Sequence, residues 1–372
     1  MFFAPNDKHK LILILEIQSS LVCGSLVLST GKNSGENPPR ILFSQTLDVP
    51  YKPSATTTYY LNTTIRDLKG MIESLLCNLH RISRSNEEVE IPRHISEVHY
   101  VLSSPWIVSQ ARTISVPFKE NTVITEEKIN KILVEERQNL GTNKRTESET
   151  IEEKIFDVRL NGYSIAEWHN REARELEVAY ALSIGGKNLI KKLTDLAEAS
   201  THSKKIHFHS ALLLRYTALR NLDELDDSYT LIHVHGELTD LVVVRKRACS
   251  FFGSFPLGIN TIIRRIAEVT NTEDKTAESL LSLYLGNHID ESHEKKVSFI
   301  MNNQISNWAN ELGKLWKSGT VDKNLPKTVF IISKAHEDFF ARSFHTIHPH
   351  ARIGKLPMDT TSSYAKAIYD IM

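Results

Sequence analysis

Apolar and polar segments alternate along the first part of the chain in an order typical of strands followed by a helix. Short apolar runs cover residues 11–17, 21–28 and 40–47, and polar turns separate them. The run 11–17, which is short, continuous and bounded by polar residues, is typical of a strand buried on both faces. Over residues 59–79 the apolar positions recur every three or four residues, which predicts an amphipathic helix.

The same order of segments returns from residue 229 onward. Apolar runs at 229–234, 241–244 and 248–255 flank two polar turns, and a helical pattern begins near Ile259. Two copies of a unit of three strands and one helix predict an internally duplicated α/β protein whose two halves face each other.

The segment between the two units has the pattern of a small α+β module. Residues 98–116 alternate as a strand pair does, and residues 153–165 and 175–186 predict further strands. Thr125 precedes a helical pattern whose first turn is acidic, which is the arrangement of an N-cap residue.

Two further stretches complete the division of the chain. The polar residues 137–154 indicate a solvated linker inside the module, and residues 188–199 predict a helix that leads back out of it. We therefore expect the N-terminal part of the first half at 1–97, the inserted module at 98–205, the return to the first half at 206–228, and the second half at 229–372.

Composition narrows the class of protein. With 372 residues, 41% of them hydrophobic, the chain is long enough for two or more cores. Lys plus Arg and Asp plus Glu both total 45, so no overall charge attracts nucleic acid or an anionic bilayer. Three distant cysteines without a C-x-x-C pair indicate a reducing compartment and argue against a structural zinc site. We expect a cytoplasmic protein without membrane insertion, because no apolar run reaches the ~18 to 20 residues of a membrane span.

Most of the candidate chemistry lies in the polar turn "HVHGELTD", residues 233–240, between two predicted strands. Such a turn is compatible with a metal site, a phosphate cradle or an ordinary hairpin. A tight turn with little side-chain bulk lets backbone N–H groups point at phosphate oxygens, and hydroxyl groups add further donors. Carboxylates nearby hold a hydrated magnesium ion and position water.

This layout resembles the actin-like ATPases of the FtsA and PilM type, which act in bacterial cell division and type IV pilus assembly. The resemblance rests on the duplicated units, the inserted module and residues 232–244 and 254–269. It implies a duplicated actin-like, ribonuclease H-like fold with an SHS2-like insert, and it implies ATP and Mg²⁺ as ligands. The family's second phosphate loop reads Asp-x-Gly-Gly-Gly-Thr-Thr-Asp. Here His233, His235 and Glu237 replace its leading acid, first glycine and third glycine.

The resemblance also implies which residues form the site. Glu16 and Asp240 stand where the family places the acids that serve magnesium and water. The positions implied to contact the nucleotide are Ser19, Ser20, Gly236, Glu237, Thr239, Gly258 and Asn260.

The chain departs from the family pattern at several of its nucleotide motifs. Gln18 stands where the first loop has glycine, Arg265 stands where an acid is common, and no glycine pair follows the predicted strand 329–332. These departures favour an assembly protein with a degraded nucleotide site, which docks through its inserted module on a membrane-anchored division or pilus component and is capable of self-association. The alternative is an active Mg-ATP-dependent ATPase.

The paired histidines raise a third alternative. His207 and His209, like His233 and His235, are two residues apart, so each pair projects from one face of a strand and resembles the H-x-H ligands of metal-dependent hydrolases. Histidines at strand ends are more often hydrogen-bonded or exposed, and we assign no metal ligands on this basis. The basic turn 245–247 lacks the interleaved aromatic residues of a nucleic-acid site.

Overall fold

The computed structural model describes residues 9–30, 39–50, 52, 55–85, 91–139, 147–220, 225–319, 325–333, 336–354 and 360–371. The chain divides into two compact units. The first unit comprises residues 1–109, 113–225 and 358–372, and the second comprises 226–357 together with 110–112.

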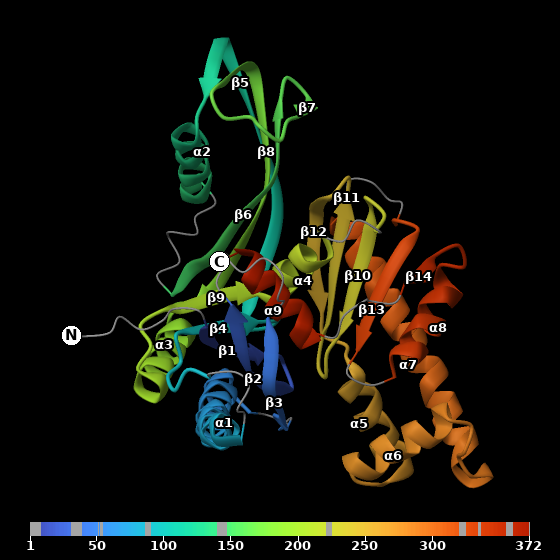
Figure 1. Ribbon diagram of the computed structural model, residues 1–372. Helices are drawn as coiled ribbons and strands as arrows, with labels where there is room; N and C mark the ends of the chain where they lie inside the picture. Colours follow the sequence, from blue (N-terminus) through green and yellow to red (C-terminus); the bar gives the residue numbers. More distant parts are fainter. Residues whose placement is uncertain are drawn as a thin grey trace. The chain divides into compact units, whose positions relative to one another are not determined.

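The first unit is built on a mixed sheet of five strands (Figure 1). Its order is β3-β2-β1-β4-β9, where β1 pairs antiparallel with β2 and parallel with β4. The outer pairs are β2 with β3, antiparallel, and β4 with β9, parallel. The strands span β1 His9–Ile17, β2 Leu21–Thr30, β3 Arg40–Asp48, β4 Glu97–Leu102 and β9 Ile206–Ser210.

Helices cover both faces of this sheet, which explains why β1 is apolar without alternation. Leu11, Leu13 and Leu15 belong to a core shared with helices α1 (Thr57–Ser85) and α3 (Lys187–Thr201). The intervening Ile12 and Ile14 face the opposite core, which includes residues of α4 (Ala211–Arg220) and α9 (Thr360–Ile371).

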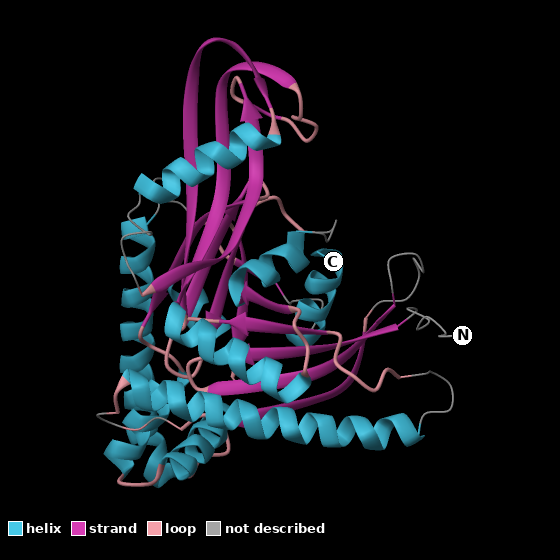
Figure 2. Ribbon diagram, turned by 90° about the vertical axis from the view of Figure 1, so that its left-hand side faces the viewer, coloured by secondary structure: helices cyan, strands magenta, loops and turns pink. Residues whose placement is uncertain are grey.

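A separate four-stranded sheet, ordered β5-β8-β6-β7, forms the inserted module. Figure 2 shows helix α2 crossing its long strands, and the module has its own core around Leu133, Val178 and Tyr180. Thr125 caps α2 as expected, because its Oγ1 accepts the Lys128 N–H at 3.3 Å. The elements are β5 Ile107–Ile124, α2 Glu126–Asn139, β6 Ser148–Leu160, β7 Tyr163–Ser164 and β8 Arg171–Gly186.

The second unit repeats the sheet of the first in order and in strand directions. Its order is β12-β11-β10-β13-β14, with antiparallel pairs on one side of β10 and parallel pairs on the other. The predicted duplication is therefore confirmed. The strands are β10 Tyr229–Val234, β11 Thr239–Arg245, β12 Ala248–Phe255, β13 Thr328–Ser333 and β14 Arg352–Gly354.

Helices of the second unit pack on its sheet around Ile262, Ile266 and the tryptophans Trp308 and Trp316. Both indole side chains are buried. The helices are α5 Ile259–Thr270, α6 Asp274–Leu285, α7 Glu291–Gly319 and α8 Glu337–Ile347. Among the helices described in either unit, none has a stretch long and apolar enough to span a bilayer.

Several segments lie elsewhere than the sequence predicts. Residues 98–102 belong to β4 of the first sheet and not to the inserted module, because their parallel pairing with β1 buries them on both faces. Helix α3, which the predicted bounds 98–205 place in the inserted module, also packs on the first sheet. Its side chains belong to the core that contains Leu11 and Leu13. Residues 360–371 form α9 of the first unit and not part of the second half, because Ala365 and Ile368 pack with Ile14.

The polar residues 137–154, predicted to form a solvated linker, lie partly in a strand. Residues 148–154 begin β6, whose backbone pairs with β8, so a half-exposed strand accommodates the charged side chains. Residues 140–146 of that run lie outside the described residues.

Candidate functional site

In each five-stranded sheet the central strand leads into an equivalent hairpin turn, from β1 to β2 and from β10 to β11. After β1, the Gln18 N–H donates to the Leu21 carbonyl at 2.9 Å, and after β10, the His235 N–H donates to the Leu238 carbonyl at 2.8 Å. The strand pairs that enter and leave the turns, at Ile17 and at Val234, have the same register. Ser19 therefore corresponds to Gly236, Ser20 to Glu237, and Glu16 to His233.

The second turn, residues 235–238, rests directly on the start of α5. The Ile259 N–H donates to the His235 carbonyl at 3.0 Å, and the Asn260 N–H donates to the Gly236 carbonyl at 2.8 Å. A Cβ on Gly258 would lie 2.4 Å from both of these carbonyl oxygens, so glycine is required there. The N–H groups at a helix start are the usual donors to a bound phosphate. Two of these N–H groups, those of Ile259 and Asn260, already donate to carbonyl groups of the turn.

Glu237 places a carboxylate of the chain itself at this helix start. Its Oε1 accepts from Arg264 Nη1 at 2.9 Å and from Asn260 Nδ2 at 3.0 Å, and its Oε2 accepts from Arg264 Nη2 at 2.7 Å. The two parallel bonds form the bidentate pairing that arginine makes with carboxylates and phosphates. Glu237 is thus an internally neutralised acid beside the turn.

Thr239 uses its hydroxyl group inside the second unit. The hydroxyl donates to the Leu257 carbonyl at 2.6 Å and accepts the Trp308 indole N–H at 3.0 Å. The residue is fully buried. These two bonds connect β11 to the segment before α5 and to α7, which gives Thr239 a structural explanation without a ligand.

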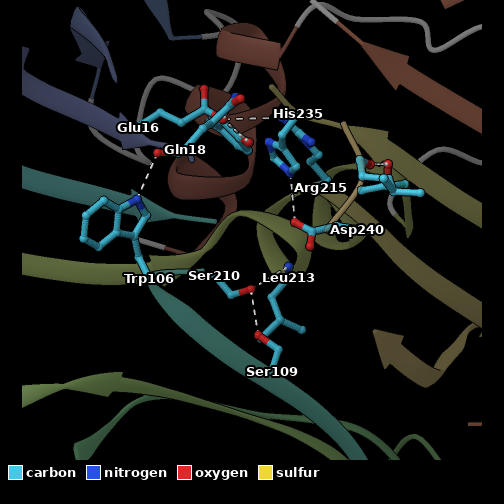
Figure 3. Close-up of polar contacts among 12 residues, drawn as sticks. Glu16, Gln18, Trp106, Ser109, Ser210, Leu213, Arg215, His235 and Asp240 are labelled. Carbon is cyan, nitrogen blue, oxygen red and sulfur yellow. Dashed lines mark hydrogen bonds and ion pairs between the residues drawn. The ribbon is translucent and has the colours of Figure 1, made fainter. Parts of the chain in front are cut away.

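Asp240 is buried beside His235 (Figure 3). Its Oδ2 lies 2.8 Å from His235 Nε2, and both side chains are almost completely enclosed. Its Oδ1 is buried without a hydrogen-bond partner among the described residues. The ring of His233 lies 3.6 Å from that of His235, centre to centre. One carboxylate oxygen is therefore paired with an imidazole, and the other is unsatisfied.

Glu16, the candidate acid of the first unit, lies in a buried network (Figure 3). Its Oε1 accepts from Gln18 Nε2 at 2.7 Å and from the Tyr364 hydroxyl at 2.9 Å, and it lies 3.5 Å from Arg215 Nη2. Burial raises the pKa of Tyr364 well above its usual value, so the phenol stays protonated and donates. The Arg215 guanidinium lies 5.2 Å above the Tyr364 ring. Glu16 therefore connects β1 to α4 and α9.

Trp106 holds the first turn, residues 18–21. Its indole N–H donates to the Gln18 carbonyl at 2.9 Å (Figure 3), and its ring packs against the first core. The Ser20 carbonyl accepts the Val49 N–H at 2.7 Å. Trp106 thus completes a core and positions a turn.

The sequence did not identify Arg215, Tyr364 and Arg264 as partners of the candidate acids. Arg215 carried a signal, because it is the sole charge within the apolar run "ALLLRYTAL" and a buried arginine needs a paired acid. Tyr364 and Arg264 carried none, since each fits an ordinary amphipathic helix.

The segment where the resemblance implies a glycine pair follows β13. Lys334 and Ala335 lie outside the described residues. His336 has a φ of 60°, a left-handed conformation that glycine adopts more easily than histidine. The segment therefore has a backbone shape suited to glycine but carries an imidazole side chain.

Comparison with solved structures identifies the fold. The chain is similar to a protein in a PilM–PilN type IV pilus biogenesis complex, with 12% identity over 96% of each chain and a TM-score of 0.64. It also matches an actin-like ATPase-fold protein of unknown function from Bacteroides thetaiotaomicron, with 10% identity over 99% of each chain and a TM-score of 0.43. The ethanolamine utilization protein EutJ from Carboxydothermus hydrogenoformans matches at 10% identity over 97% of this chain and 89% of that chain, with a TM-score of 0.49.

No protein-family model matches the chain, and no curated protein sequence matches it. The chain has the actin-like ATPase fold, which confirms the duplicated actin-like part of the fold class expected from the sequence.

Proposed function

We propose that this chain is a PilM-like assembly protein of the cytoplasm in which the nucleotide site has degraded. In this role the protein organises a membrane-anchored partner and does not turn over ATP. The similarity to a protein of the PilM–PilN complex supports the assignment at the level of fold. The chemistry of the second turn supports the loss of nucleotide function.

The observation that most strongly supports the loss of nucleotide function is that the Glu237 carboxylate is hydrogen-bonded within the chain. It takes two hydrogen bonds from Arg264 and one from Asn260, and the first N–H groups of α5 are bonded to the turn. A triphosphate needs these donors for its own oxygens, and the Glu237 carboxylate already occupies those of Arg264 and Asn260. The residues present therefore do not fit the phosphate groups that the fold family binds.

The acids do not fit magnesium chemistry well either. Glu16 Oε1 is occupied by Gln18 and Tyr364, and Asp240 Oδ2 is paired with His235. His233 stands where the family has its leading acid, and an imidazole does not balance the charge of Mg²⁺ as a carboxylate does. We derive no hydrolytic step through these residues.

Calorimetric titration with ATP, with and without MgCl₂, tests the proposal. We expect no saturable heat at ATP concentrations up to about 1 mM, the limit of a binding free energy near −4 kcal/mol. The Glu237→Gly variant removes the competing carboxylate and should bind ATP more tightly than the parent. A parent that binds Mg-ATP in the micromolar range would contradict a degraded site.

An active ATPase is the second candidate, and one observation favours it. Asp240 Oδ1 is buried without a partner among the described residues, and an unsatisfied carboxylate oxygen is costly unless a ligand or water completes it. Phosphate release measured on the parent and on Asp240→Ala separates the two candidates, since an active enzyme loses its turnover with the carboxylate.

The partner should dock at the inserted module. A cavity of about 600 Å³ lies between β6 of the module and β9, lined in part by Glu149, Glu152 and Glu153. This acidic lining favours a basic segment on the membrane-anchored partner, and it gives the protein a peripheral place at the membrane without insertion. A Glu149→Lys, Glu153→Lys variant should lose co-sedimentation with membranes that carry the partner. Unchanged co-sedimentation would place the docking surface elsewhere.

A further inference from the structure

Adjacent strands of the first sheet bring four residues of metal-binding types, one glutamate and three histidines, to one face. β4 and β9 run parallel, with His99 opposite His207 and Val101 opposite His209. Because side chains alternate along a strand, Glu97 and His99 share a face with His207 and His209. Tyr100 and Phe208 point to the other face, where their rings stack 5.2 Å apart. We call Glu97, His99, His207 and His209 the histidine cluster.

Three atoms of the histidine cluster surround one small space. His99 Nε2 lies 3.6 Å and His207 Nε2 lies 3.8 Å from the same oxygen, Glu97 Oε2. One ligand atom from each of these residues lies within 4.8 Å of the others. Tetrahedral metal ligands with bonds of ~2.0 to 2.2 Å are separated by roughly 3.3 to 3.6 Å, so the three atoms need to move little to share an ion.

A buried nitrogen that makes no hydrogen bond to any described residue, with Glu97 Oε2 3.6 Å away, points into this space. The His99 side chain is 3% exposed, and its Nε2 is buried without a hydrogen-bond partner among the described residues. Its other nitrogen, Nδ1, lies 3.0 Å from His209 Nε2. A buried polar atom without a partner costs free energy, and a cation between Nε2 and the Glu97 carboxylate removes this cost.

The remaining neighbours resemble the outer partners of a metal site. His209 holds the distal nitrogen of His99, and its own Nδ1 lies 3.9 Å from Glu152 Oε1. Metal-bound imidazoles usually have their second nitrogen fixed in this way, which sets the tautomer and ring orientation. The histidine cluster thus has both ligands and the groups that orient them.

Two lysines approach the other oxygen of Glu97. Lys10 Nζ lies 3.1 Å and Lys205 Nζ lies 3.8 Å from Oε1. Their side chains are 41% and 68% exposed, so both ammonium groups remain free to move into solvent when a cation binds. His207 and His209 line the cavity between β6 and β9, and the His207 side chain is 46% exposed, which gives an ion a path to the site.

We propose that the first unit binds one divalent transition-metal ion of the Zn²⁺ type through Glu97 Oε2, His99 Nε2 and His207 Nε2. Two imidazoles and one carboxylate form a ligand set that suits zinc, and water completes the coordination. The site lies at β4 and β9 and includes no residue of either hairpin turn, and it does not depend on the proposed loss of nucleotide binding.

Titration of the full chain with ZnCl₂, followed by calorimetry, and with CoCl₂, followed by visible absorption, tests this site. We expect one ion per chain, and at least a ~100-fold loss of affinity in His207→Gln and in Glu97→Gln. The exposed His293→Gln variant serves as the matched control and should bind as the parent does. Circular dichroism checks that each variant folds.

Three results would overturn the site. The first is a parent that binds no Zn²⁺ below about 100 μM, which corresponds to a binding free energy near −5.5 kcal/mol. The second is parent-like binding by both His207→Gln and Glu97→Gln. The third is loss of binding in His235→Gln but not in His207→Gln, which would assign the ion to the buried group of His233, His235 and Asp240.

Discussion

Glu237 and Arg264 are joined by two parallel hydrogen bonds, of 2.9 and 2.7 Å, across the start of α5. The pair neutralises the negative charge of Glu237 beside the turn at residues 235–238. The carboxylate is therefore hydrogen-bonded by the protein itself. The expected consequence is a turn that is rigid without nucleotide.

A double-mutant cycle measures this pair. Glu237→Ala, Arg264→Ala and the double variant should show a coupling free energy of about 0.5 to 3 kcal/mol in urea unfolding, because the two side chains are largely shielded from water and bonded bidentately. The exposed pair Lys314 and Glu311 provides a comparison cycle, for which we expect a coupling below about 1 kcal/mol. Additive single effects at Glu237 and Arg264 would show that the pair does not hold the turn.

Gly258→Ala should destabilise the second unit. The added methyl group would lie 2.4 Å from the carbonyl oxygens of His235 and Gly236, so the turn or the helix start must shift. We expect a loss of about 1 to 3 kcal/mol in the free energy of unfolding. Gly70→Ala is the matched control, because its methyl group meets no atom within 4 Å and lies on helix α1, where alanine stabilises. Equal effects of the two substitutions would contradict the close approach.

How much the sequence predicted depends on how local each feature is. The β10–β11 hairpin and the helix at Ile259 follow from short-range periodicity, and both were predicted. The partners of Glu16 were not, because Arg215 and Tyr364 lie 199 and 348 residues away in the chain. The same reason explains why α9 was assigned to the wrong half. The hydrogen-bond partners of Thr239 lie in α7 and at Leu257, which are distant in the sequence. The sequence position of this hydroxyl suggested contact with a phosphate, but its hydrogen bonds give it a structural role.

Tyr364→Phe should loosen α9 from the first sheet. The change removes the hydroxyl that donates to Glu16 Oε1 in a buried site, and we expect a loss of about 1 to 3 kcal/mol. Amide hydrogen exchange in α9 should accelerate, because the helix loses a tie to β1. Tyr163→Phe, whose side chain is highly exposed, should leave both quantities unchanged. Parent-like exchange in Tyr364→Phe would indicate that packing alone holds α9.

Trp106→Phe should affect the first turn more than the core. Phenylalanine keeps most of the apolar contact but removes the indole N–H that bonds the Gln18 carbonyl at 2.9 Å. We expect a loss of about 0.5 to 1.5 kcal/mol in unfolding free energy and faster amide exchange at residues 18–21. Trp308→Phe is the counterpart in the second unit, since it removes the indole bond to Thr239. Exchange at residues 18–21 that equals the parent's would leave Trp106 as a core residue only.

Phosphate release by the purified chain with Mg-ATP shows whether the hairpin at residues 233–240 supports ATP hydrolysis. We expect the parent and Asp240→Ala both to release phosphate at the uncatalysed background rate. The combined variant His233→Asp, Glu237→Gly should bind ATP better than the parent, because it restores an acid and removes the competing carboxylate. A parent that hydrolyses ATP above background, at a rate that Asp240→Ala abolishes, would contradict the account and identify an active site.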